Sequence, residues 1–115
     1  MQYLLALYLD ESAWGKMTPE QQQQGSAAYA AYTEALTKAG VYKAGNRLRP
    51  SASATTIRTT NGKSQVLDGP FADTKEQLAG YDLIDVADLD AAMLWAGRCP
   101  ASQHGIVEVR AIWAM

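Results

Sequence analysis

Residues 2–9, QYLLALYL, constrain the fold of this chain more than any other segment. After Gln2 the run is continuously apolar and aromatic, with no alternation between polar and apolar positions. A strand that is solvated on one side alternates, whereas a strand covered on both faces is apolar throughout. We therefore predict that residues 2–9 form a strand of a sheet whose two faces are both covered.

Two segments carry the signals of amphipathic helices. The first begins at a capping box formed by Thr18 and Gln21, and Gly40 ends it. Gly25 weakens its first turns, so we expect order mainly after Gly25. The second follows the capping residue Asp88. The inner stripe of the first helix is predicted at Ala28, Tyr32, Ala35, Leu36 and Ala39, and that of the second at Leu89, Ala92, Met93 and Ala96.

Asn61-Gly62 separates TTIRTT from KSQVLD, two runs of strand character. Asn-Gly between such runs is the strongest short signal for a β-hairpin, because a type I′ turn needs positive φ at both central residues. Three further segments read as strands. They are residues 40–50, which are irregular with a bulge or bend at Gly45, residues 78–86, and residues 104–114.

The predicted order β-α-β-β(hairpin)-β-α-β, in which the hairpin counts once, indicates an α+β protein with a ferredoxin-like split βαβ unit and an extra hairpin strand. Residues 1–115 form one domain. Two helices cover only one face of such a sheet, and the other face would expose a large apolar patch. We therefore expect a homodimer in which a second copy covers the open sheet face.

The charge distribution excludes several classes of partner. The net charge is -2 and neither sign clusters, so we expect no nucleic acid and no anionic membrane as partner. The first residues lack the basic region and cleavage site of a signal peptide, and no apolar run is long enough to span a membrane. A cytoplasmic protein is the expectation. Cys99 is the single cysteine and has no partner for a disulfide or a metal site.

The segment DGPFADTKEQLAGYDLIDV, followed by a helix and HGIVEVR, resembles the DGPF branch of the YCII-related family over nearly the whole chain. The resemblance implies a ferredoxin-like dimeric α/β barrel with a cleft beside the sheet. In the YciI-like branch it implies a His–Asp pair with the His on the first helix. Here Tyr29 stands about where some relatives carry a histidine, so that pair does not carry over.

Three residues are candidates for proton transfer: His104, Asp68 and Asp82. His104 is the only histidine, and histidine suits acid–base work near neutral pH. Asp82 lies in an apolar strand, where a carboxylate needs a partner or water. Asp68 opens the turn Asp-Gly-Pro-Phe, which is also explained as a rigid corner anchored in the core by Phe71.

Arg47, Arg58 and Arg110 are candidates for ligand binding, because a guanidinium binds an anion through two parallel hydrogen bonds. The structural alternative is that one of them neutralises Asp82 in an ion pair.

Two functions follow from these residues. One is a small dimeric enzyme, or a degenerate enzyme, that performs acid–base chemistry on a small polar or anionic substrate. The other is a ligand-binding or accessory regulatory module without chemistry, a role indicated by relatives that are encoded near sigma factors. We expect no metal and no cofactor, since a lone histidine is thin evidence for a haem ligand.

Overall fold

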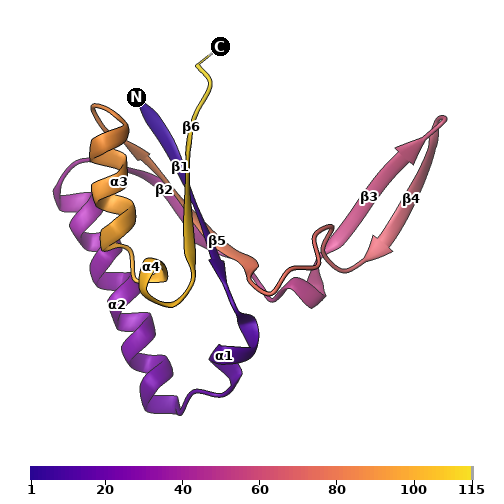
Figure 1. The fold of residues 1–115 in the computed structure, drawn as a ribbon, viewed down its shortest axis with the longest axis horizontal. Coiled ribbons are helices and arrows are strands. Elements are labelled where there is room, and N and C mark those ends of the chain that lie inside the picture. Colours follow the sequence, from indigo (N-terminus) through magenta and orange to yellow (C-terminus); the bar gives the residue numbers. More distant parts are fainter. Residues whose placement is uncertain (115) are drawn as a thin grey trace.

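The computed structural model of this protein describes residues 1–114 (Figure 1). The elements run in the order β1 (Gln2–Leu9), α1 (Glu11–Gly15), α2 (Pro19–Lys38), β2 (Tyr42–Arg47), the 3-10 turn η1 (Ser51–Ser53), β3 (Thr55–Thr60), β4 (Lys63–Asp68), β5 (Gln77–Asp85), α3 (Leu89–Arg98), α4 (Ala101–His104) and β6 (Ile106–Ala111). None of the helices in residues 1–114 is long and apolar enough to cross a membrane.

The main sheet has the strand order β2-β5-β1-β6, and every neighbouring pair is antiparallel. β1 lies inside the sheet, with Leu5 opposite Asp82 of β5 on one side and opposite Val109 of β6 on the other. β1 and β2 are therefore parallel with β5 between them, and β5 and β6 are parallel with β1 between them. The predicted mixed α+β class is confirmed, and residues 1–114 form no closed barrel.

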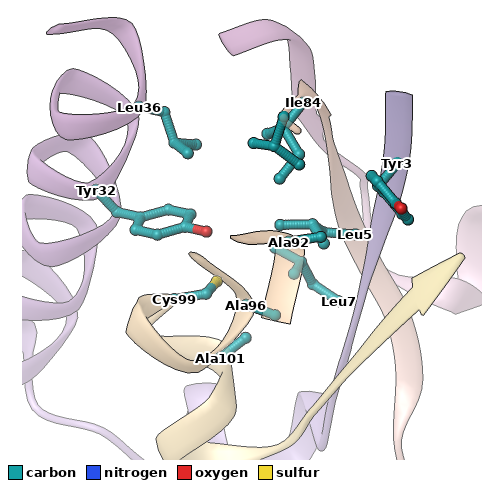
Figure 2. Packing of buried hydrophobic residues seen from close by; sticks show 11 residues of the cluster. Tyr3, Leu5, Leu7, Tyr32, Leu36, Ile84, Ala92, Ala96, Cys99 and Ala101 are labelled. Carbon is teal, nitrogen blue, oxygen red and sulfur yellow. The ribbon is translucent and has the colours of Figure 1, made fainter. Parts of the chain in front are cut away.

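The core lies between one face of this sheet and the helices, which stand on the same side of it in Figure 1. Figure 2 shows Tyr32 and Leu36 of α2 facing side chains of the sheet, with Cys99 and Ala101 below them. The Tyr32 hydroxyl donates to the Trp95 carbonyl at 2.7 Å, which ties α2 to α3. Burial of this face is the main stabilising contribution to the fold.

α2 is continuous from Pro19, so the prediction that order lies mainly after Gly25 is wrong. The predicted capping box is present, with Thr18 and Gln21 bonded to each other's backbone amides. The ring of Trp14 also packs against Gly25, 3.4 Å from the position that a Cβ would take. These contacts compensate for the low helix propensity of glycine.

The helical stripes are narrower than the sequence pattern predicted. In α2, Tyr32 and Leu36 are buried, whereas Ala28 and Ala39 at the ends of the stripe are exposed. In α3 only Ala92 and Ala96 of the predicted stripe are buried, and Leu89 and Met93 are half exposed or more. Small side chains let α3 approach the sheet closely, so its larger apolar residues lie at the margins of the contact.

The β3–β4 hairpin forms as predicted, with Asn61 and Gly62 at φ values of 52° and 77°. It makes a separate two-stranded sheet, however, and does not add a strand to the main sheet. The hairpin projects away from the helices (Figure 1), and every residue of β4 is exposed. Phe71 is 78% exposed, so the prediction that it anchors the turn in the core is wrong.

The hairpin makes the whole chain extended. The radius of gyration is 16.0 Å, compared with about 13 Å for a compact domain of this length. An isolated two-stranded hairpin is only marginally stable in water. Ile57 and Val66 lie opposite each other in the hairpin, and both of these apolar side chains are exposed. The packing against another element that normally stabilises a hairpin is therefore missing at this pair within residues 1–114.

Candidate functional site

A cavity of about 1080 Å³ opens between the helix-bearing face of the sheet and the helices α1 and α2. β1, β2 and β5 form its floor, and residues 48–50 and His104 contribute to its edge. Apolar atoms make up most of its lining surface, and many polar and charged side chains also contribute. A mainly apolar pocket that contains polar groups is typical of a small-molecule site.

Asp82 lies on the floor of this cavity and is only 8% exposed. The strict alternation of β5 places Gly80, Asp82 and Ile84 on one face, and the structure shows that this is the helix-bearing face. Gly45 lies opposite Asp82 on β2, and a Cβ at position 45 would collide with a carboxylate oxygen of Asp82. The glycine therefore provides the space that the carboxyl group occupies. The predicted irregularity of β2 lies just before it, between Tyr42 and Ala44.

Burial raises the pKa of Asp82 to about 6, because a charged carboxylate loses its hydration there. Within residues 1–114 no lysine or arginine pairs with Asp82, so the alternative of a structural ion pair is not realised. At neutral pH, roughly one molecule in ten then carries the protonated carboxyl. A group of this kind accepts and returns a proton under physiological conditions.

Tyr29 of α2 also lines the cavity, and its side chain is half-buried. Burial raises its pKa to about 12, and the charge of Asp82 contributes to this rise. Its phenol therefore stays protonated at neutral pH and serves as a hydrogen-bond donor.

Arg47, the last residue of β2, also lines the cavity, with its guanidinium carbon 4.7 Å from the ring centre of Trp14. Such stacking is favourable and still leaves the N–H groups at the guanidinium edge available. The loop end of the cavity thus carries a positive charge held on an aromatic surface.

His104 is the last residue of α4, and its exposed side chain contributes to the cavity edge. Of the six residues singled out from the sequence, the cavity brings together Asp82, His104 and Arg47. Their roles in chemistry or binding stay predictions.

The other three predicted site residues lie elsewhere. Asp68 and Arg58 are exposed on the projecting hairpin, where the Arg58 guanidinium carbon lies 5.9 Å from the ring centre of Phe71. Arg110 is opposite Leu4 on the helix-free face of the sheet and donates to Glu108 at 3.1 Å. None of these three residues lines the cavity.

Tyr29, Trp14 and Gly45 were not identified as site residues from the sequence. Their signals were weak, because a tyrosine, a tryptophan and a glycine have ordinary structural roles in most folds. Within residues 1–114 no cluster of three potential metal ligands occurs. Burial raises the pKa of the Cys99 thiol to about 11, so this thiol is not a reactive thiolate at neutral pH.

Comparisons with known proteins agree with this architecture. The family described as YCII-related domain matches residues 1–115. An uncharacterized protein of Rhizobium meliloti (strain 1021) is 38% identical over 96 residues, which make up 84% of this chain and 77% of that protein. A solved structure of 5-chloro-2-hydroxyhydroquinone dehydrochlorinase (TftG) from Burkholderia phenoliruptrix AC1100, in complex with 2,5-dihydroxybenzoquinone, aligns with a TM-score of 0.57 and 14% identity. The alignment covers 98% of this chain and 94% of that one, so the two share a fold.

Replacing Asp82 by Asn should stabilise the protein at pH 8 but not at pH 4. The folded-state pKa of about 6 lies above the ordinary value of 3.8, so the neutral carboxyl stabilises the fold fully below pH 4 and this contribution is lost as pH rises through 6. The variant should therefore gain roughly 2–3 kcal/mol at pH 8. Urea unfolding at both pH values measures this gain. Asp68→Asn removes the same charge from the exposed hairpin and serves as the control, and an equal gain at both pH values would contradict the prediction.

Gly45→Ala should destabilise the fold by about 1–3 kcal/mol, because the added methyl group displaces the Asp82 carboxyl. The loss should shrink when Asp82 is also replaced by Ala, since the carboxyl is then absent. A double-mutant cycle by urea unfolding measures the coupling. Gly97→Ala on α3, where no atom lies within 4 Å of the new methyl group, should be neutral or stabilising. Additive effects in the cycle would show that Gly45 does not serve the carboxyl.

Proposed function

Because this chain belongs to the YCII-related family, we propose that its cavity is the active site of an enzyme that moves a proton on a small polar or anionic molecule. The observation that carries this proposal is the buried, unneutralised carboxyl group of Asp82 on the floor of the cavity. An unpaired buried charge costs stability. Such a cost is typical of functional sites, where a perturbed pKa is needed for the chemistry.

Asp82 is the base in this proposal. Above pH 6 its carboxylate accepts a proton from an acidic C–H or O–H group of the substrate. The resulting neutral carboxyl is stable in its buried surroundings. In an isomerisation it returns the proton to another position of the substrate. In an elimination the electrons of the C–H bond form a double bond, the leaving group departs with the electrons of its own bond to carbon, and the carboxyl releases the proton to water.

Tyr29 and His104 assist Asp82 in this mechanism. The Tyr29 phenol donates a hydrogen bond to a substrate oxygen, which makes a neighbouring proton more acidic. His104 exchanges protons between the cavity edge and water, since an imidazole both donates and accepts them. Asp68 lies on the hairpin, so its predicted catalytic role requires the hairpin of a second copy to reach the cavity.

The fold relative supports proton chemistry in this architecture. The similar solved structure is a dehydrochlorinase in complex with 2,5-dihydroxybenzoquinone. Loss of hydrogen chloride from an organic molecule includes removal of a proton by a base. The alternative function is a binding or accessory regulatory module that uses the same cavity without chemistry, and it differs in leaving the protons of its ligand unexchanged.

Proton exchange in a simple ketone tests the proposal. The probe is 4-oxocyclohexanecarboxylate, whose protons beside the ketone exchange slowly without a catalyst and are followed by proton NMR in deuterated water. We expect the protein to accelerate exchange, with a rate that rises through pH 6 and then levels off, because the basic form of Asp82 is required. Asp82→Asn should lose about 100-fold or more of this rate.

Two matched variants accompany this test. Tyr29→Phe keeps the ring and removes only the hydroxyl, so it should lower the exchange rate without preventing binding. Asp68→Asn measures the predicted role of Asp68. Exchange that is unaffected by Asp82→Asn would contradict the role of Asp82 as the base, and binding with no exchange at all would favour the binding module.

We also propose that two copies pair through the open face of the sheet, in a ferredoxin-like dimeric α/β barrel. The face opposite the helices includes Leu4, Ala6 and Tyr8 of β1 and Leu83 of β5, and no helix formed by residues 1–114 covers it. The strand order and the two parallel crossovers are those of a split βαβ unit. A second copy would cover this face. Both faces of β1 would then be covered, which explains why this strand is apolar throughout.

Size measurement by light scattering tests the pairing. At micromolar concentration the protein should have twice the mass of its 12.4 kDa chain. Leu83→Glu should produce monomers, because it places a charge at the centre of the open face. Leu94→Glu, at a position 72% exposed on α3, should leave the dimer intact. A parent protein that is monomeric under these conditions would contradict the pairing.

A further inference from the structure

Three arginines in residues 1–114 stack on aromatic rings, but only one of these pairs lines the cavity. Arg98 lies 4.2 Å from the ring centre of Trp95, and Arg58 lies 5.9 Å from that of Phe71. Neither of these two arginines contributes to the cavity. Arg47 on Trp14 does, and within residues 1–114 its guanidinium forms no hydrogen bond or ion pair.

Two acidic side chains that line the same cavity accept hydrogen bonds from serines. The two Glu11 carboxylate oxygens accept from the Ser51 amide at 2.7 Å and from the Ser51 hydroxyl at 2.8 Å. Asp10 caps α1, and its Oδ1 accepts from the amide and the hydroxyl of Ser12. Since neither carboxylate pairs with Arg47, the N–H groups of Arg47 can bind an anion from the cavity.

The sheet register places Arg47 and Asp82 on the same face of two neighbouring strands. Arg47 is opposite Gly80, and Gly45 is opposite Asp82. The backbone positions of Arg47 and Asp82 are therefore diagonal neighbours on the cavity floor, with a glycine at each of the other two corners. A guanidinium and a carboxyl that line one cavity from adjacent strands can contact the same small molecule.

We infer that the substrate is a small organic acid, whose anionic group binds Arg47 on Trp14 while another part of the molecule presents its labile proton to Asp82. This inference rests on the proposed function, because it assigns two groups of the same cavity. Trp14 contributes by holding the guanidinium plane in place. Binding of a planar oxyanion through two N–H groups then fixes the orientation of the substrate.

Binding of matched neutral and anionic ligands tests this inference. Calorimetric titration compares 4-oxocyclohexanecarboxylate with its carboxamide, which has the same ring and no charge. We expect Arg47→Gln to weaken binding of the acid about 10- to 100-fold and to leave binding of the amide nearly unchanged. Arg98→Gln removes a guanidinium stacked on a tryptophan outside the cavity and should change neither affinity.

Arg47→Lys provides a second variant that retains the charge and is gentle to the fold. It should bind the acid more weakly than the parent and more tightly than Arg47→Gln, because an ammonium lacks the planar fork of N–H donors. Arg49→Gln reports on the other arginine of the cavity lining, which is not stacked on a ring, and its effect should be smaller than that of Arg47→Gln.

The outcomes separate this inference from the proposed function. Loss of acid binding in Arg47→Gln without proton exchange in the parent would support the anion site and overturn the enzyme. Proton exchange that depends on Asp82, combined with equal affinity for acid and amide, would support the enzyme and overturn the anion site. Absence of saturable binding of the acid up to about 10 mM would also overturn the anion site.

Discussion

The buried carboxyl of Asp82 is the constraint on which the candidate site depends. The alternation of β5 that places Ile84 in the core also places Asp82 on the same face. A shift by one residue would expose Asp82 but would also remove Ile84 from the core, so the apolar register holds the charge inside. The protein therefore retains an unpaired carboxyl whose pKa is raised to about 6. The unpaired carboxyl lowers the stability of the fold, whereas the proposed reaction requires it.

Two glycines allow close approach around this carboxyl. Gly45 leaves room for its oxygen, and Gly80 lets the backbone of Asn46 and Arg47 lie against β5. The wall above them comes from α1 and the first half of α2, where Trp14 packs against Gly25. The first turns of α2 are ordered because they form this wall, and the same contact positions the aromatic ring beneath Arg47. Trp14 thus packs against Gly25 of α2, lines the cavity and stacks on the guanidinium of Arg47.

The sequence predicted the elements well where the signal was local. The capping box at Thr18, the Asn61-Gly62 turn, the Asp88 cap and the alternation of β5 depend on neighbouring residues, and the structure contains all four. The sequence predicted less well where distant segments meet. Phe71 is exposed because its turn belongs to a projecting hairpin, and Leu89 and Met93 lie at the margin because alanines bring α3 close to the sheet. Local patterns carry no information on which element lies above which.

By itself, the sequence determined the class of the fold, the hairpin and which residues of β5 share a face, because capping, turn geometry and period-two alternation are properties of consecutive residues. It also identified Asp82 and His104 as candidates for proton transfer and Arg47 as a candidate for ligand binding. Only the tertiary structure decided that these three line one cavity while Asp68, Arg58 and Arg110 do not. The register between the strands and the placement of α1 and α2 over them determine which residues line the cavity. Both arise from contacts between residues far apart in the chain, such as Gly45 with Asp82 and Trp14 with Arg47.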